Sequence, residues 1–199
     1  LRLYGQEYTT TSWTMAKMNM TIHDMEGDIG LGDTMNDPKF KDKTGHGVKK
    51  FDRVVANPMW NQPDFKEELY LNDNYHRFPA GNPGGKADWG WAQHILSSLK
   101  DDGRAAIVLD TGAASRGSGS SNTDKEKAVR KWFIDHDLVE GVLYLPDNLF
   151  YNTTAPGIII FLNKNKPAKL KNKIFLINAG KEFLKGNPKN YISDEQIKK

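Results

Sequence analysis

The stretch FDRVVANPMWNQ, residues 51–62, indicates both the kind of sheet and the place of a site within it. Its apolar run is typical of a buried strand, and Asn57-Pro58 ends that strand abruptly. Further continuous apolar runs along the chain alternate with segments whose apolar residues recur at helical spacing. We therefore expect strands covered on both faces by helices, which means an α/β fold with a doubly wound, mainly parallel sheet.

The same reasoning assigns the other elements. We expect strands over residues 1–5, 28–31, 105–109, 138–145, 158–162 and 174–177, and helices over residues 10–23, 88–100 and 124–135. Asp88 is the expected N-cap of its helix, and Ser193 that of a further helix near the end. This pattern predicts one domain over residues 1–178 and the start of a C-terminal helical extension over residues 179–199.

Composition narrows the classes of function. The chain has 199 residues, enough for a sizeable core, and a net charge of +3, too small to argue for nucleic acid by itself. The chain contains no Cys, which fits a cytoplasmic protein, and no apolar run approaches the roughly 20 residues that span a membrane. The five His residues lack metal-ligand spacing, so we expect no metal site.

The end of the 51–62 stretch combines two acceptors with an aromatic ring. Asn57 offers a side-chain carbonyl oxygen, and Pro58 offers a backbone carbonyl from a turn that proline stiffens. Trp60 adds a flat face on which a planar group can stack. Together they predict a clamp for an –NH2 group on an amide or an aromatic base.

At this point the sequence resembles a known family. VVANPMW is similar to motif IV of amino-group methyltransferases, Asp/Asn/Ser-Pro-Pro-aromatic, except that Met59 stands where the second Pro is usual. The chain as a whole closely resembles the modification subunit of type I restriction-modification systems, an N6-adenine DNA methyltransferase. The resemblance lies in five segments, in this order: LYGQEYTTTSWTMAKMNMTIH, GDIGLGDTM, FDRVVANPMWN, WAQHILSSLKDDGRAAIVL and EKAVRKWFIDHDLVEGVLYLPDNLFYNTTAPGIIIFLNK. The resemblance covers nearly the whole chain and implies a Rossmann-like fold that binds S-adenosylmethionine.

The resemblance also implies roles for single residues. Glu7 would hold the ribose hydroxyls of S-adenosylmethionine, and Asp33, with help from Thr34, the adenine of that cofactor. Taken alone, Glu7 is better explained as a solvated surface carboxylate, and the other role of Asp33 is that of an N-cap or turn residue.

On the substrate side, Asn57 and Pro58 would accept the two hydrogens of the target adenine N6, and Trp60 would stack on the flipped base. Phe150 and Tyr151 would line the base pocket, although packing roles explain them equally well.

Some of the family's features are missing here. Its glycine-rich cofactor loop precedes the strand that ends at Glu7, and no such loop occurs in this sequence. We therefore expect a fragment that lacks its first strand and binds the cofactor weakly by itself. Arg116 and the Gly/Ser run after it are interpreted as a mobile linker.

The resemblance implies several partners: double-stranded DNA, a specificity subunit, a restriction subunit and a second modification subunit. Two alternatives stay open. The same clamp suits the amide of a protein glutamine, as in N5-glutamine methyltransferases. The departure at Met59 also suits a non-catalytic assembly module that retains the fold.

Overall fold

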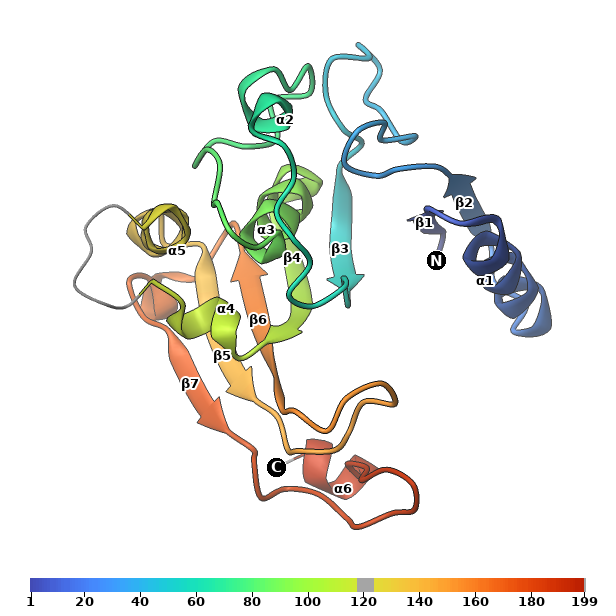
Figure 1. The fold of residues 1–199 in the computed structure, drawn as a ribbon, viewed down its shortest axis with the longest axis vertical. Coiled ribbons are helices and arrows are strands. Elements are labelled where there is room, and N and C mark those ends of the chain that lie inside the picture. The colour runs from blue at the N-terminus through green and yellow to red at the C-terminus, as the bar shows by residue number, and fades with distance from the viewer. Residues whose placement is uncertain (118–123, 199) are drawn as a thin grey trace.

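The computed structural model describes residues 1–117 and 124–198, which form a larger and a smaller sheet with their helices (Figure 1). The larger sheet has five strands in the order β3-β4-β6-β5-β7. The strands are β3 (Phe51–Ala56), β4 (Leu99–Asp110), β5 (Val139–Tyr144), β6 (Gly157–Asn163) and β7 (Phe175–Asn178). Only β6 is antiparallel to its neighbours, so the expected α/β class with a mainly parallel sheet is confirmed.

Two helices cover one face of this sheet. They are α3 (Asp88–Ser97) and α5 (Lys125–Asp135), and their apolar residues form one core with alternate residues of β4 and β6. Trp89 and Phe133 lie at its centre with ring centroids 5.1 Å apart. Full burial of such a side chain contributes about 1.5–3 kcal/mol.

The opposite face of β4 and β6 is only half-buried within the described residues, as Ala106, Val108, Ile159 and Phe161 show. The helices thus cover the two faces less evenly than the apolar runs predict. Short elements complete the chain: α2 (Glu67–Leu71), α4 (Gly112–Ser115), the 3-10 turn η1 (Ala168–Leu170) and α6 (Asp194–Ile197). Ser193 caps α6 as expected. No helix in residues 1–117 or 124–198 is long and apolar enough to cross a bilayer.

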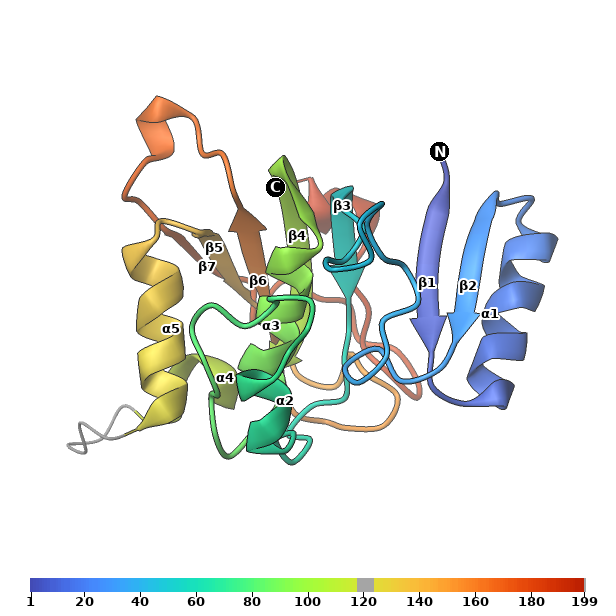
Figure 2. The ribbon, with the colours of Figure 1, turned by 90° about the horizontal axis from the view of Figure 1, so that it is seen from above.

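The smaller sheet pairs β1 (Leu3–Glu7) with β2 (Gly27–Leu31) in parallel, and α1 (Thr10–Ile22) packs beside it. Trp13 on α1 donates its indole N–H to the Ile29 carbonyl at 2.7 Å. Tyr4 and Phe51, 5.3 Å apart, bridge the two sheets. In Figure 2 the arrows of β1, β2 and β3 point the same way, so their carboxyl ends lie on one side of the molecule.

Three details differ from the sequence-based expectations. Strand β3 is an edge strand of its sheet rather than a buried one, and Val55 is 82% exposed. Strand β4 already begins at Leu99, where the sequence favoured the end of a helix. Asp88 does not cap α3, because Ala87 is the N-cap and the Asp88 carboxylate pairs with Arg116 instead.

Candidate functional site

The polar residues expected to carry function lie at or just after strand ends. Glu7 ends β1, Asp33 follows β2 by two residues, and Asn57 follows β3. A further acidic residue, Asp110, ends β4. Since these parallel strands end on one side (Figure 2), the structure brings all four to the same side of the molecule. Ligands of doubly wound sheets bind at this edge.

The structure joins Asn57 and Trp60 directly. The Trp60 indole N–H donates to Asn57 Oδ1 at 3.0 Å. An indole nitrogen can only donate, so this bond fixes the oxygen end of the Asn57 amide toward Trp60. A carbonyl oxygen has two lone pairs, and Asn57 is exposed to solvent, so its oxygen retains capacity for a second donor.

Phe150 meets Trp60 from the loop between β5 and β6. The two rings lie edge to face with centroids 4.7 Å apart. Gly157, the first residue of β6, lies under both rings, because a Cβ placed there would be 2.8 Å from Trp60 Cη2 and 3.1 Å from Phe150 Cε2. The structure thus brings Phe150 against Trp60, and Gly157 is a member of this contact that the sequence did not reveal. The role of Phe150 in a base pocket stays a prediction.

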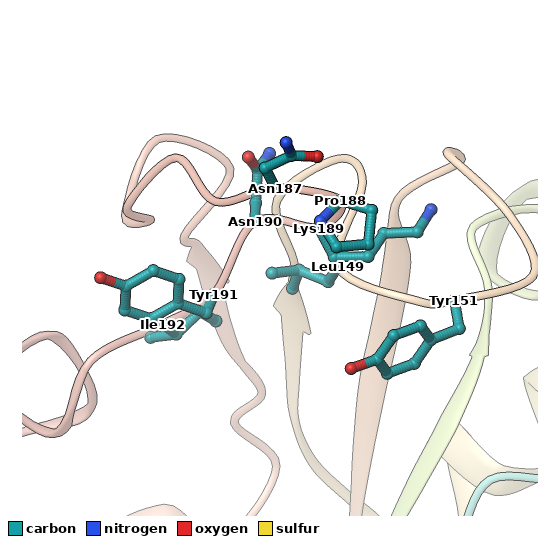
Figure 3. Close-up of a pocket in the computed structure, with 8 residues that line it drawn as sticks. All are labelled: Leu149, Tyr151, Asn187, Pro188, Lys189, Asn190, Tyr191 and Ile192. Atoms are coloured by element: carbon teal, nitrogen blue, oxygen red, sulfur yellow. The ribbon is translucent and has the colours of Figure 1, made fainter.

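Tyr151, the next residue, is 84% exposed. It lines an open hollow of about 480 Å³ between the 147–154 loop and the C-terminal segment. Figure 3 shows Tyr151 and Tyr191 on opposite sides of Leu149 and Pro188, with Lys189 between them. Neither Asn57 nor Trp60 lines this hollow, so it lies beside the expected clamp and is not part of it.

Asp33 and Glu7, the two acidic residues expected to bind the cofactor, differ in their side-chain hydrogen bonds. Asp33 organises its own turn: Oδ1 accepts from the N–H groups of Met35 and Asn36 at 2.8 and 3.1 Å, and Oδ2 accepts from the Asn36 amide at 2.8 Å. Burial opposes ionisation of Asp33, but these hydrogen bonds and the nearby Arg77 charge outweigh it and lower its pKa. Glu7 is partly exposed, and no side-chain hydrogen bond among the described residues uses its carboxylate.

A hollow of about 590 Å³ lies next to the Asp33 turn. Its lining residues are Asn36, Asp64, Phe65, Lys66, Glu68, Leu69 and Asn72. The ligand roles of Glu7, Asp33 and Thr34 stay predictions. The structure does show Asp33 as a turn residue, which is the other role that the sequence allowed.

Arg77 is a buried residue that sequence reasoning missed. Its guanidinium is fully buried, pairs with Asp73 at 2.7 Å, and donates to the carbonyls of Thr34 and Met35 at 3.1 and 2.6 Å. It also donates to His94 Nδ1 on α3 at 3.2 Å. Arg77 therefore ties the turn after β2 to the main body, and no local sequence signal marks it.

Arg116 is likewise fixed, contrary to the mobile-linker interpretation. It pairs with buried Asp88, with Glu126 at 2.8 Å and with Asp110 at 3.4 Å, and donates to Asn61 Oδ1 at 3.1 Å. Burial raises the pKa of both Asp88 and Glu126, although the Arg116 charge opposes that shift. The Gly/Ser run at residues 118–123 lies outside the described residues.

Comparison with known proteins places this geometry in a family. The sequence model described as N-6 DNA Methylase matches residues 1–199. The chain is 42% identical over 99% of its length to the type I restriction enzyme MjaVIII methylase subunit of Methanocaldococcus jannaschii, of which it spans 35%. It is 37% identical over 89% of its length to the type I restriction enzyme HindI methylase subunit of Haemophilus influenzae, of which it spans 37%.

A solved structure supports the same conclusion. The type I restriction-modification methyltransferase subunit from Streptococcus thermophilus superposes with a TM-score of 0.85 at 31% identity, covering 98% of this chain and 40% of that one. The fold is the Rossmann-like α/β fold of S-adenosylmethionine-dependent methyltransferases. The chain spans about a third of the length of the curated relatives it matches, and it belongs to the N-6 DNA methylase family.

Proposed function

We propose that this chain is the base-holding part of a type I DNA adenine-N6 methyltransferase, which transfers a methyl group from S-adenosylmethionine to a flipped adenine. The observation that carries the proposal is the contact of Asn57, Trp60 and Phe150 at the end of β3, in a chain that the N-6 DNA methylase model matches from end to end. This match favours DNA over a protein glutamine as the source of the –NH2 group.

The chemistry explains why these residues are needed. The lone pair of the adenine N6 is delocalised into the ring, which makes this nitrogen a poor nucleophile. The Asn57 side-chain oxygen and the Pro58 carbonyl would accept its two hydrogens in a geometry that suits a tetrahedral nitrogen, and so stabilise the charge that develops on it. The exposure of Asn57 gives the proton that the product amine loses a direct path to water.

Trp60 and Phe150 would hold the base. A purine that leaves the duplex loses its stacking partners, and an aromatic face replaces part of that interaction, by about 1–3 kcal/mol per base. The edge-to-face packing of Phe150 on Trp60, with ring centroids 4.7 Å apart, orients the indole and supports a clamp that is formed before the base arrives. Tyr151 would contribute at the rim, where its ring is exposed.

The residues expected to bind the cofactor have side chains that suit its hydroxyl and amino groups. The Glu7 carboxylate lies at a strand end and is unused by other side chains among the described residues, which suits two adjacent ribose hydroxyls. The hydrogen bonds that lower the pKa of Asp33 keep its carboxylate ionised. Asp33 and Thr34 lie in the turn that also carries Asn36, one of the residues lining the 590 Å³ hollow. When bound, S-adenosylmethionine would supply an electrophilic methyl group on its sulfonium.

Further assignments rest on the relatives. We propose cytoplasmic action on double-stranded DNA in a complex with a specificity subunit, a restriction subunit and a second copy of the methylase subunit. We also infer that residues 1–178 belong to the catalytic domain and residues 179–199 to a helical extension of it.

The test is methyl transfer by the full-length protein with its specificity subunit. Unmethylated DNA and labelled S-adenosylmethionine should give N6-methyladenine, and Asn57→Ala should lower kcat by about 10²–10³ through loss of one acceptor. Lys131→Ala is a matched control on exposed helix surface. Absence of product with the unaltered complex would instead support the non-catalytic assembly role.

A further inference from the structure

Gly157 lies where the Trp60 ring needs room. It is buried at the start of β6, and a Cβ there would approach Trp60 Cη2 to 2.8 Å and Phe150 Cε2 to 3.1 Å. The first of these distances is shorter than side-chain contacts in proteins allow. Any residue other than glycine would therefore displace the rings or the strand.

The strand cannot readily be the part that moves. Gly157 is paired with Asp110 of β4 in the sheet ladder, and its carbonyl accepts from the Leu145 N–H at 2.9 Å. Since both sides of β6 at this point are held by neighbouring strands, a methyl group at position 157 would push on Trp60 and Phe150.

The bond to Asn57 leaves the same long edge of the indole, because Nε1 and Cζ2 are both bonded to Cε2. The ring is thus held at two places, by its N–H donation to Asn57 Oδ1 at 3.0 Å and by its packing on Gly157 and Phe150. A shift of the six-membered ring away from Gly157 carries the N–H with it. The position of the Asn57 oxygen thus depends on the space that Gly157 leaves.

We propose that Gly157 is a positioning residue for the methyl-accepting site: by seating Trp60 it fixes the Asn57 amide. This inference rests on the proposed function. The Trp60–Asn57 bond is also a constraint on the turn at Met59, which lacks the second proline that is usual in the motif.

The first experiment measures methylation by the full-length protein with its specificity subunit. Gly157→Ala is expected to lower kcat about ten- to a hundredfold, as misplacement by about 1 Å does, with the KM for S-adenosylmethionine unchanged. Gly141→Ala is the control, because its Cβ would meet Phe175 O at 3.2 Å within the same sheet but touches neither Trp60 nor Phe150. An equal loss of kcat in both variants would show that general sheet strain, not positioning, is responsible.

The second experiment uses a double-mutant cycle. Phe lacks the fused ring that carries Cη2 and Cζ2, so in a Trp60→Phe background the Gly157→Ala substitution should change kcat by less than about threefold. Phe150→Leu should likewise relieve part of the Gly157→Ala defect. If Gly157→Ala costs the same with and without the indole, the inference is wrong.

A readout without catalysis separates this inference from the proposed function. In protein labelled with 5-fluorotryptophan, the 19F resonance that Trp60→Phe removes should shift in Gly157→Ala and stay in place in Gly141→Ala. A complex that methylates no DNA would refute the proposed function, and the shift would then decide only whether Gly157 seats Trp60. An unshifted resonance in Gly157→Ala would refute the inference whatever the activity.

Discussion

Lowering the pH from 7 to 5 should destabilise the protein through one side chain, His94. Loss of solvation lowers the pKa of His94 from 6.5 to about 3, and the adjacent Arg77 charge adds to the shift while Asp73 opposes it. Its Nδ1 accepts a hydrogen bond from Arg77 at 3.2 Å, which requires a neutral ring. The folded protein therefore excludes a proton that the unfolded chain binds below pH 6.5.

The sign and size follow from this difference. Between the unfolded and folded pKa values, the free energy of unfolding falls by about 1.4 kcal/mol for each pH unit lost. From 6.5 down to pH 5 the limiting loss is about 2 kcal/mol, and because the ring keeps some contact with solvent we expect about 1–2 kcal/mol. Above pH 7 the contribution is complete and stability should be flat with respect to this group.

The assay is urea unfolding at pH 7 and pH 5, followed by tryptophan fluorescence. His94→Gln is the matched variant, because its amide oxygen can still accept from Arg77 but does not titrate. Carboxylates change their charge equally in both proteins, so their effect cancels in the comparison. Identical losses of stability in wild type and His94→Gln would refute the reasoning.

Three further substitutions test the packing and the caps. Arg77→Met should cost about 3–5 kcal/mol in urea unfolding, because it leaves Asp73 buried without its counter-charge; a cost below about 1 kcal/mol would contradict the burial of this pair. Phe133→Ala removes a fully buried ring and should cost about 3–5 kcal/mol, with Phe133→Leu clearly milder. Asp124→Ala removes the side chain that accepts from the Lys127 N–H at the start of α5, and should lower stability by about 1 kcal/mol in thermal unfolding, whereas Asp124→Asn should not.

Local pattern was sufficient for much of the fold. Strand β3 begins and ends where its apolar run and Asn57-Pro58 predict, and the helical spacing in residues 124–135 locates α5 within one residue. The solvent exposure of individual residues was harder to predict from the sequence. The place of a strand in a sheet depends on pairing between distant segments, and the 82% exposure of Val55 follows from the edge position of β3 among the described strands.

Long-range pairing explains the remaining differences. Asp88 has the residue type and position of an N-cap, but Arg116, which lies 28 residues further along, binds its carboxylate. In the candidate site, the Asn57–Trp60 bond spans three residues and was foreseeable as a cluster. The contribution of Gly157 was not, because its meaning depends on which ring the fold places above it.

The reversed direction of β6 has a consequence for how such sites diversify. Because β6 is antiparallel to β5, the connection over residues 145–156 leaves and re-enters the sheet at the same end, which is also the end where Asn57 follows β3. A hairpin of this kind can gain or exchange residues without altering strand register, since length adds little to the entropy of closing a loop. Relatives could thus remodel the wall that faces the base while the amide at the tip of β3 keeps its place.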